Sequence, residues 1–532
     1  MRTHASLLVA LRLSVATALK PLPVPDVQIP LGDKFVGAPA AGNELLPKIQ
    51  FQPPSSLMHG DSANTGSTDS PGPLGNDPEV TSALQILGVM LWGPNDTLSG
   101  GRADISNPAS PRIGLGAYDP TTLENLAEWY PDDPDEYLNL GYMEQRLEDS
   151  SLLISGLSGR LYVVQRQDTP DGKTTLTQTR EISLNSTLSE GETLLNSLFD
   201  TEGNIWFTSG TLSGTPLGPQ SSTTVGYVEP NGRIHTLHIP EQQVENGIAV
   251  NGTTAYVVTG PLNSTDTAPA TGYVWAFTTD PSEEEDKVTT VWKAEYDSGT
   301  RQKPGGLTRG GGTTPVLLGD EYVATTDNAD GRVNLLVVRQ AQAAAEGGDQ
   351  VACKVPLFEE GASSIDIRPT VHFDGSSYGV VIVNTYNMPP IEQQKDEILD
   401  MNGAWNNMTS MPGGIVRVDV SSASASAGKR GGGVSCEVKW ESDIRTKSVP
   451  ALSTKTGLLY GSLQDEDLAI KGQYNWYIAA IDWDSGSLVW KRRTGAGGTF
   501  NDNQYPGTVG LGRFYQSLSF GVVYVEDGSS GS

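Results

Sequence analysis

Residues 476–493 read WYIAAIDWDSGSLVWKRR, an apolar run, a short polar turn and a second run that ends near Trp490. The turn Asp-Ser-Gly-Ser is of the kind that joins two antiparallel strands, so the stretch predicts a β-hairpin. Looser versions of this phrase recur along the chain, which indicates a repeat architecture. They begin near Ile113, Arg160, Gly226, Gly272, Arg332 and Gly414.

A second kind of hairpin lies between these copies and consists of two apolar strands joined by a short turn. One hairpin of each kind makes a four-stranded sheet, and a ring of such sheets is a β-propeller. The sequence therefore predicts an all-β fold, a single β-propeller over residues 84–528. Seven blades are expected, with six and eight as alternatives because the repeat near residues 138–165 is degenerate. Clear examples of the second hairpin are residues 247–259, 314–325, 369–383 and 450–461.

The end of the chain predicts how the ring closes. The last hairpin, residues 508–525, has no outer hairpin after it. We expect it to complete the sheet begun by residues 113–131, so that strands from both chain ends close the ring. Closure of this kind removes the exposed sheet edges at which chains aggregate.

Composition and charge limit which folds and which binding partners are possible. The chain has 532 residues, too many for one ordinary domain but suited to one large closed β-architecture. Its formal net charge of −28 argues against nucleic acid and anionic membranes as partners, because both are polyanionic. No stretch after the N-terminus is apolar enough to span a bilayer. We expect a monomer that handles a small-molecule or carbohydrate ligand.

The first residues indicate export, followed by a leader. Residues 1–18 combine Arg2, an apolar stretch and small residues near a cleavage site, which is typical of a secretory signal peptide; an unstructured N-terminus is the alternative. Residues 19–83 are rich in proline and show no sustained period, which favours a mostly disordered or surface-wrapping leader. Five N-glycosylation triplets agree with secretion to the extracellular space. They begin at Asn95, Asn185, Asn251, Asn263 and Asn407.

The chain has two cysteines, Cys353 and Cys436, and each precedes an alternating strand at the same place in the repeated phrase. In an oxidising compartment they could form a disulfide between adjacent repeats, and two free buried thiols are the alternative. Neither has the His or Cys neighbours that a catalytic thiol or a zinc site would need.

Two phrases resemble those of known propeller families. Within the first hairpin, Ala480, Asp482, Ser485, Gly486 and Trp490 match the tryptophan-docking repeat of the quinoprotein alcohol dehydrogenase-like propellers. In that repeat the glycine serves the turn and the tryptophan packs between neighbouring blades. Residues 203–208 (GNIWFT), followed by residues 226–234, look like the blade repeat of virginiamycin B lyase and of gluconolactonase-like propellers. The resemblance implies the fold, and one fold hosts many reactions.

The residues depart from the cofactor sites that these resemblances imply. Redox enzymes of the quinoprotein family carry a vicinal cysteine pair over pyrroloquinoline quinone (PQQ) and a calcium held by carboxylate and amide side chains. Here the two cysteines are far apart and one repeat alone is clean. We therefore expect no cofactor, with calcium and PQQ as alternatives. No anchor motif identifies gluconolactonase-type metal ligands, so no metal site is predicted.

Loop lengths indicate which face of the propeller carries a site. If each sheet has an inner and an outer hairpin, the turns within the inner hairpins are short and the loops at the opposite face are long. Functional residues concentrate in such loops. Side chains that begin the inner strands at this face would ring the channel mouth and hold a small polar ligand, or merely satisfy the strand ends. They are Asn246, Arg368, Arg445, Lys447, Asn501, Asn503 and Tyr505.

Acidic residues at the same face could carry acid–base chemistry. Asp366 and Asp502 precede inner strands, and Asp327 lies in a loop with Asn328 and Asp330. That loop could bind calcium or form an ordinary tight turn, which Asp, Asn and Gly favour. A pair such as Asp327 with Asp366, or Asp502 with Asp366, could serve as general acid and base.

Together these features predict a secreted, glycosylated propeller that binds or converts a small molecule or a sugar. As an enzyme it would be a lyase, isomerase or cyclase without a redox cofactor. A non-catalytic extracellular binding protein or scaffold is the rival function, and a PQQ-type oxidoreductase is a further alternative. The insertion at residues 384–412, with a short helix expected over residues 391–401, could be a lid or a glycosylated loop.

Overall fold

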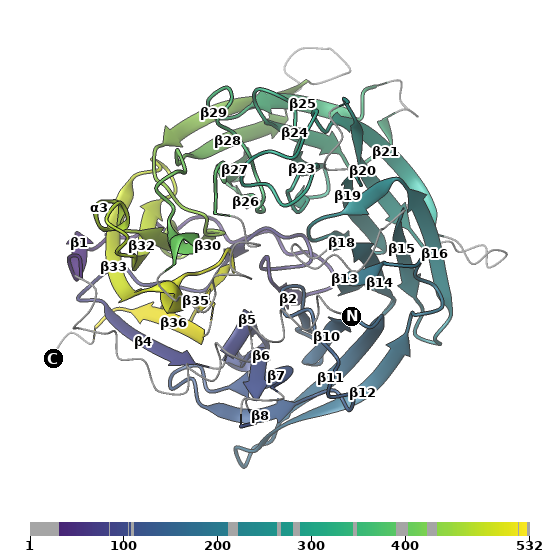
Figure 1. Ribbon diagram of the computed structural model, residues 1–532, viewed down its shortest axis with the longest axis horizontal. Helices are drawn as coiled ribbons and strands as arrows, with labels where there is room; N and C mark the ends of the chain where they lie inside the picture. Colours follow the sequence, from purple (N-terminus) through teal and green to yellow (C-terminus); the bar gives the residue numbers. More distant parts are fainter. Residues whose placement is uncertain are drawn as a thin grey trace.

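The computed structural model shows a ring of eight antiparallel sheets around a central axis (Figure 1). The prediction of an all-β, single β-propeller is confirmed, and the blade number is eight, one of the two alternatives to seven. The structure describes residues 31–528 except 85, 105, 108–110, 211–221, 263–267, 280–287, 344–347, 390–402, 423–432 and 520.

Each of the first four blades runs from an innermost strand to an outer strand in chain order. Blade 1 contains β5 (Ile86–Trp92), β6 (Leu98–Asp104), β7 (Arg112–Tyr118) and β8 (Asn125–Trp129). Blade 2 contains β9 (Glu144–Arg146), β10 (Ser151–Gly156), β11 (Arg160–Asp168) and β12 (Thr174–Ser183). Blade 3 contains β13 (Thr193–Phe199), β14 (Ile205–Gly210), β15 (Ser222–Val228) and β16 (Ile234–Pro240). Blade 4 contains β17 (Gln242–Val244), β18 (Ala249–Asn251), β19 (Thr254–Pro261), β20 (Thr271–Thr278) and β21 (Thr289–Asp297).

The next three blades repeat this order, and the eighth has three strands from the C-terminal end. Blade 5 contains β22 (Val316–Leu318), β23 (Tyr322–Thr326), β24 (Asn334–Arg339) and β25 (Val351–Pro356). Blade 6 contains β26 (Thr370–Phe373), β27 (Tyr378–Val383), β28 (Ile415–Ser422) and β29 (Val434–Ser442). Blade 7 contains β30 (Ala451–Ser453), β31 (Leu458–Gln464), β32 (Asn475–Asp482) and β33 (Leu488–Ala496). Blade 8 contains β34 (Gly507–Gly510), β35 (Arg513–Leu518) and β36 (Gly521–Glu526), and the short helical segments are η1 (Pro94–Asp96), η3 (Ala404–Asn406), α3 (Glu466–Ala469) and η4 (Gly498–Phe500).

An N-terminal strand, β4 (Glu79–Leu84), closes the ring by pairing with β36 along its whole length (Figure 1). Closure by both chain ends is thus confirmed, but the expected partner, residues 113–131, was wrong. Those residues form β7 and β8 and pair with β5 and β6 instead. The final hairpin therefore needs an outer strand of its own, which explains the extra blade.

The leader differs from the expected disordered or surface-wrapping segment, because much of it fills the channel. From the outer edge of blade 7, where β1 (Phe35–Gly37) pairs with β33, the leader reaches the channel. There β2 (Ser55–Leu57) pairs with β9, and β3 (Ser67–Thr68) pairs with β30. Between β2 and β3 its carbonyls accept hydrogen bonds from innermost strands of blades 4 to 7. These strands would otherwise present unpaired backbone N–H groups inside the channel. The donors are Val250, Leu317, Val371 and Leu452.

The hydrophobic core lies between neighbouring blades. Trp490, in β33, is fully buried in a cluster that joins blades 7 and 8. Its ring lies near Tyr460 and Phe35, so the leader strand β1 also covers this interface. The packing role that the tryptophan-docking repeat implies for Trp490 is therefore observed.

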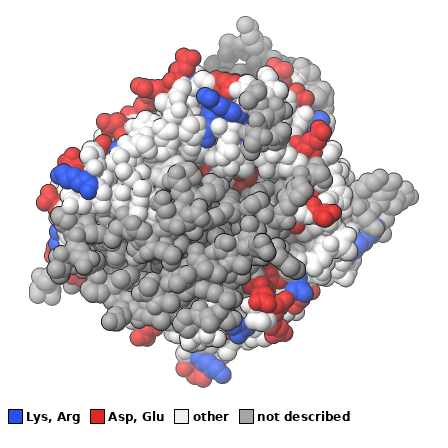
Figure 2. Space-filling model, in the orientation of Figure 1, with Lys and Arg blue, Asp and Glu red and all other residues white. Residues whose placement is uncertain are grey.

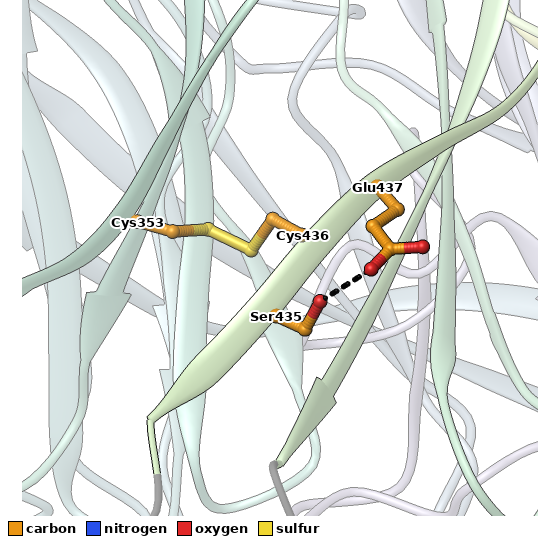
Figure 3. Close-up of a disulfide and its surroundings, with 4 residues drawn as sticks. All are labelled: Cys353, Ser435, Cys436 and Glu437. Atoms are coloured by element: carbon orange, nitrogen blue, oxygen red, sulfur yellow. Dashed lines mark hydrogen bonds between the residues drawn. A yellow bond between two sulfur atoms is a disulfide. The ribbon is translucent and has the colours of Figure 1, made fainter.

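A disulfide joins Cys353 in β25 to Cys436 in β29, the outer strands of blades 5 and 6 (Figure 3). It closes a sequence separation of 83 residues. Pairing between adjacent repeats, rather than two free thiols, is thus what the structure shows. The bond links two sheets that are otherwise held by side-chain packing.

The surface carries many more acidic than basic side chains, as the net charge of −28 requires. Figure 2 shows acidic groups around the rim of the ring with few basic ones among them. In the part of the chain that the structure describes, every helix is too short or too polar to cross a bilayer.

Candidate functional site

A cavity of about 320 Å³ lies near the axis at the long-loop face, where the innermost strands begin. Most of its wall comes from the segments before or at the start of the innermost strands of blades 1, 2, 4, 6, 7 and 8. Ile113, Leu157, Leu307 and Ser519 complete it from other strand ends and loops. Met58 and His59 of the leader also line it. Most of the wall is apolar, with tyrosines and a few convergent polar groups, as is usual in small-molecule sites. We call it the site cavity.

Two buried carboxyl groups, Glu245 before β18 and Asp366 before β26, meet in the site cavity. Burial, followed by the charge of Glu245, holds the pKa of Asp366 well above its usual range. Burial also raises the pKa of Glu245, whereas a hydrogen bond from Asp366 lowers it. Because that hydrogen bond further raises the pKa of Asp366, Asp366 is the member of the pair that keeps its proton to higher pH, and this proton can be shared with Glu245.

Backbone and hydroxyl donors fix the two carboxyl groups. The backbone N–H of Thr308 donates to Glu245 Oε1 over 3.0 Å, and the Thr308 hydroxyl donates to Oε2. The backbone N–H of Leu307 donates to Asp366 Oδ1 over 3.2 Å. Asp366 Oδ2 is buried and has no hydrogen-bond donor among the described residues, which leaves Glu245 as its partner. It is therefore the oxygen that can carry the shared proton toward a ligand.

Asn246 organises a second group of polar side chains beside the carboxyl pair. Its Oδ1 accepts hydrogen bonds from the hydroxyls of Tyr142, over 2.8 Å, and Thr314, over 2.6 Å. Because the Thr314 proton is used there, its oxygen must accept from Nε2–H of His59, 3.1 Å away. His59 Nδ1 then carries the free lone pair and has no partner. Burial, then Arg368, lowers the pKa of His59 well below its ordinary value, so the ring is neutral.

A strained turn before β34 completes the cavity wall. Asn503 and Gln504 both have left-handed backbone, with φ of 50° and 62°, and both line the cavity with Tyr505. Non-glycine residues in this region cost energy and cluster at functional sites. The Gln504 amide lowers the pKa of Asp366 slightly against the larger effect of burial, which places it beside the carboxyl pair.

Four of the predicted site residues meet at the site cavity: Asn246, Asp366, Asn503 and Tyr505. Asp502 and Lys447 are buried outside its wall; burial raises the pKa of Asp502 to about 6 against the opposing charge of Lys447. The predicted pairing of Asp502 with Asp366 is therefore replaced by an interaction with Lys447.

Three other predicted ligand residues lie elsewhere. The Asn501 amide donates to Asn406 Oδ1 over 2.9 Å, which uses it inside the loop structure. Arg445 pairs with Glu466 at the surface over 3.0 Å. Arg368 lines a different cavity, whereas Ile367, the residue before it, lines the site cavity.

The loop of Asp327, Asn328 and Asp330 is a structural turn and does not reach the site cavity. Asp327 accepts hydrogen bonds from the backbone and the amide of Asn334, over 2.7 and 2.8 Å, and pairs with Lys354. The Asn328 amide donates to two backbone carbonyls, and Asp330 accepts from the backbone of Thr300. The structure does not bring Asp327 and Asp366 together as the predicted acid–base pair, because the Asp327 oxygens are used within blade 5.

Sequence reasoning missed several cavity residues. Glu245 directly precedes Asn246 and occupies the same strand-start position as Asp366, so its position was the available signal. Gln504 stands between two residues that were predicted. Tyr142 lies in the degenerate repeat, and His59 lies in the leader, whose path through the channel left no local pattern.

The predicted glycosylation sites fall at exposed or half-buried positions where they are described. Asn95 and Asn185 are exposed, and Asn251 and Asn407 are half-buried. Asn263 and the helix expected over residues 391–401 lie outside the described residues. Modification of these asparagines stays a prediction.

The residues of the site cavity do not fit a quinone and its calcium. Among the described lining residues there is no tryptophan to floor a planar quinone. Nor does any group of three or more His, Cys, Asp or Glu side chains in the described ranges have a geometry that could hold a metal. The disulfide uses both cysteines far from the axis.

At the level of sequence, the chain resembles a known protein over part of its length. No protein-family model matches the chain. An uncharacterized protein of Archaeoglobus fulgidus is 26% identical over 214 residues, and the chain spans only 38% of that relative's length while 38% of the chain is matched.

Solved structures align over most of the chain. A quinohemoprotein alcohol dehydrogenase from Pseudomonas putida HK5 aligns over 90% of this chain and 80% of its own, with a TM-score of 0.50 and 9% identity. That of Comamonas testosteroni aligns over 88% and 79%, with a TM-score of 0.49 and 8% identity. At 9% identity the likeness to the Pseudomonas putida HK5 enzyme establishes the fold alone. The chain is an eight-bladed β-propeller with the fold of the quinoprotein alcohol dehydrogenase-like propellers.

Proposed function

We propose that the protein binds a small, largely apolar molecule with a hydrogen-bonding head in the site cavity and transfers a proton to and from it. The observation that carries this proposal is the buried pair of Glu245 and Asp366, in which burial and the charge of Glu245 raise the pKa of Asp366. Such a pair offers a base, the Glu245 carboxylate, next to an acid, the Asp366 carboxyl. Two titratable groups whose environments push their pKa values apart are the usual source of acid and base roles.

The position of the pair favours one class of reaction over another. Glycosidases hold their two carboxyl groups about 5 Å or more apart, so that a sugar and often a water fit between them. The hydrogen bond that contributes to the shifted pKa values of Glu245 and Asp366 requires a closer approach than this. Proton abstraction next to a carbonyl, with return of a proton to the oxygen, needs only one face of the ligand. An isomerase, lyase or cyclase is therefore the enzyme class that we propose.

The cavity wall supports a ligand that is apolar over most of its surface. Leu138, Leu140, Ile367 and Val449 contribute to the wall. Polar groups at one end, including Gln504, would orient the head of the ligand toward Asp366 Oδ2. This arrangement also weakens the case for a free sugar, whose many hydroxyls would lose water without gaining partners.

The test begins with binding and then measures the proton transfer itself. Small ketones, aldehydes and hydroxy compounds would be screened by their effect on the unfolding temperature. Those that bind would be incubated with the protein in D₂O and followed by ¹H NMR. We expect loss of the signal of the hydrogen next to the carbonyl, and we expect Glu245→Gln and Asp366→Asn to slow that exchange by about 100-fold or more.

Two glycine substitutions, one on the cavity wall and one away from it, test whether the ligand binds in the site cavity. A Cβ added to Gly141, on the cavity wall, meets only Asn139 Oδ1 at 3.5 Å, so Gly141→Leu adds a side chain without backbone strain. A Cβ at exposed Gly433 meets nothing within 4 Å. Gly141→Leu should weaken binding and Gly433→Leu should not. If ligands bind but no isotope exchange occurs, the protein is a binding protein and the proposal of an enzyme is rejected.

Secretion and N-glycosylation are part of this proposal. The disulfide between Cys353 and Cys436 and the exposed positions of Asn95 and Asn185 support it. Expression in a eukaryotic secretory host, followed by enzymatic glycan removal, should lower the apparent mass. An unchanged mass, or retention of the protein in the cell, would contradict this part.

A further inference from the structure

A second cavity, of about 180 Å³, lies further along the channel than the site cavity. The inner strands show this stacking. In blade 1, Leu87 and Gly88 line the site cavity, and Val89, Met90 and Trp92 line the second one. In blade 8, residues 503–505 line the first and residues 506–509 the second. The leader contributes to both cavities through Met58.

The polar groups of this second cavity differ in kind from those of the site cavity. Its described lining residues include Lys48 and Arg368 but no Asp or Glu. In a chain with 63 acidic and 35 basic residues, a cationic hollow without a carboxylate is contrary to the overall charge. Serine and threonine residues of the leader, together with Thr508 of blade 8, supply the remaining polar side chains of the wall.

Arg368 carries a charge that no carboxylate in this cavity balances. The side chain is 2% exposed. Its Nη1 donates to Pro369 O and Thr370 Oγ1, its Nη2 donates to Pro450 O, and its Nε has no partner. Burial lowers the pKa of Arg368 to about 9, which leaves the guanidinium protonated at neutral pH.

The nearest leader carboxylates are already engaged. Asp61 accepts hydrogen bonds from Lys48 Nζ over 2.6 Å and from the backbone and hydroxyl of Thr65. Asp69 accepts from the backbone of Lys48 and from the hydroxyl of Thr454. Asp61 thus pairs directly with Lys48 and acts on Arg368 only through its charge, without a hydrogen bond to the guanidinium, so Arg368 Nε can still donate to a ligand.

A second buried donor lines the same cavity without a partner. The indole Nε1–H of Trp92, at the end of β5, is buried and has no hydrogen-bond acceptor among the described residues. An indole can only donate, and so can a guanidinium. Unpaired buried N–H groups are costly and call for an acceptor. Two such donors on one cavity therefore indicate a ligand that only accepts and that is negatively charged.

We infer that the second cavity binds a small oxyanion, a carboxylate or an inorganic anion such as sulfate or phosphate, through Arg368 Nε and Trp92 Nε1. This site is separate from the site cavity and does not depend on the proposed reaction. The anion would also link the leader to blades 1 and 6, from which the two donors come.

Calorimetric titration of the full-length protein with sodium sulfate, sodium phosphate and sodium acetate, at constant ionic strength, tests this inference. We expect saturable binding of at least one anion with one site per chain, and a rise in unfolding temperature that follows the same affinity. Comparison of the three titrations shows whether the site prefers a carboxylate or an inorganic oxyanion. Binding should also change the fluorescence of Trp92.

Variants locate the anion. Trp92→Phe keeps the aromatic ring and removes the donor, so affinity should fall several-fold and the fluorescence response should disappear. Arg368→Met should weaken binding by at least about tenfold, as expected for a charged hydrogen bond. Lys439→Met, at an exposed position on β29, is the control and should bind normally.

Contrary outcomes are equally clear. Absence of saturable binding by all three anions, or identical affinities in wild type and Trp92→Phe, would overturn the inference, because the donors would then face water alone. If Arg368→Met fails to fold by circular dichroism, Trp92→Phe and Arg368→Lys decide the matter. Unchanged affinity in both would place the anion elsewhere and reject the site.

Discussion

The hydroxyl of Tyr142 donates a hydrogen bond to Oδ1 of Asn246 over 2.8 Å and so joins blade 2 to blade 4 across the channel mouth. Blade 3 lies between blades 2 and 4 in the ring, so this hydrogen bond joins two blades that are not neighbours. It also fixes the amide of Asn246, on which the orientation of Thr314 and His59 depends. The site is thus held together by contacts between blades rather than within one.

Tyr142→Phe removes this bond and leaves the ring in place. We expect a loss of about 1 kcal/mol in the free energy of unfolding, the usual value for one neutral hydrogen bond, and weaker binding of ligands in the site cavity. Urea unfolding and ligand titration measure the two effects. Tyr273→Phe is the control, because no hydrogen bond of the Tyr273 hydroxyl is present in the described residues. Equal losses in both variants would contradict the role given to Tyr142.

Turnover should require the singly protonated form of the carboxyl pair. The rate should fall at low pH as Glu245 becomes protonated, and at high pH as Asp366, whose pKa is raised, loses its proton. Asp366→Asn should remove the alkaline decline along with most of the activity, and Glu245→Gln should remove the acidic one. The pH profile of isotope exchange checks this. An alkaline limb that persists in Asp366→Asn would assign the acid to another group.

Glu144, on β9 of blade 2, should make stability fall as pH rises. Burial raises its pKa to about 8, although the backbone N–H of Phe199 donates to it over 2.7 Å. The folded protein therefore holds a proton that the unfolded chain releases near pH 4.5. Stability should be fullest below that pH and should fall by about 1.4 kcal/mol per unit up to about pH 8, where the contribution is lost.

The matched variant for this prediction is Glu144→Gln, which keeps an acceptor for Phe199 and cannot ionise. The difference in unfolding free energy between variant and wild type should grow in favour of the variant as the pH increases from 5 to 8. Parallel urea curves at each pH measure it. A constant difference would mean that Glu144 is ionised in the folded protein.

Loss of the disulfide should destabilise the ring without abolishing it. Replacing Cys353 and Cys436 together by Ser opens a closed loop with a sequence separation of 83 residues. The chain-entropy model gives a cost of about 4 to 5 kcal/mol. Guanidinium unfolding with and without reductant measures it. Reductant should lower the wild-type midpoint to that of the variant, and a midpoint that reductant leaves unchanged would contradict a disulfide in solution.

Trp490→Ala should cost about 3 to 5 kcal/mol, since it opens a cavity between blades 7 and 8. Trp490→Phe should cost less, because it keeps an aromatic ring against Tyr460. Thermal unfolding compares the two. Similar losses would show that the indole does not pack tightly at this interface.

The sequence predicted most of the ring because hairpins are encoded locally. Alternation in Trp476–Arg493 and the turn at Gly486 depend on neighbouring residues, so the repeat could be followed along the chain. The error at residues 113–131 came from assigning a strand to the wrong sheet, which local pattern cannot prevent. The site was found in part for the same reason: Asp366 and Asn246 occupy a recurrent strand-start position, whereas His59 does not.

From the sequence one could predict a closed ring of four-stranded sheets and the face that carries the long loops. One could also predict that the two cysteines can pair with each other. Tertiary contacts place the carboxyl residues Glu245 and Asp366 together in one cavity and the basic residues Lys48 and Arg368 in the next, and they run the leader along the channel. The physical reason is distance along the chain. Strand pattern and turn chemistry act between neighbours, while burial and charge at the axis depend on how distant blades are brought together.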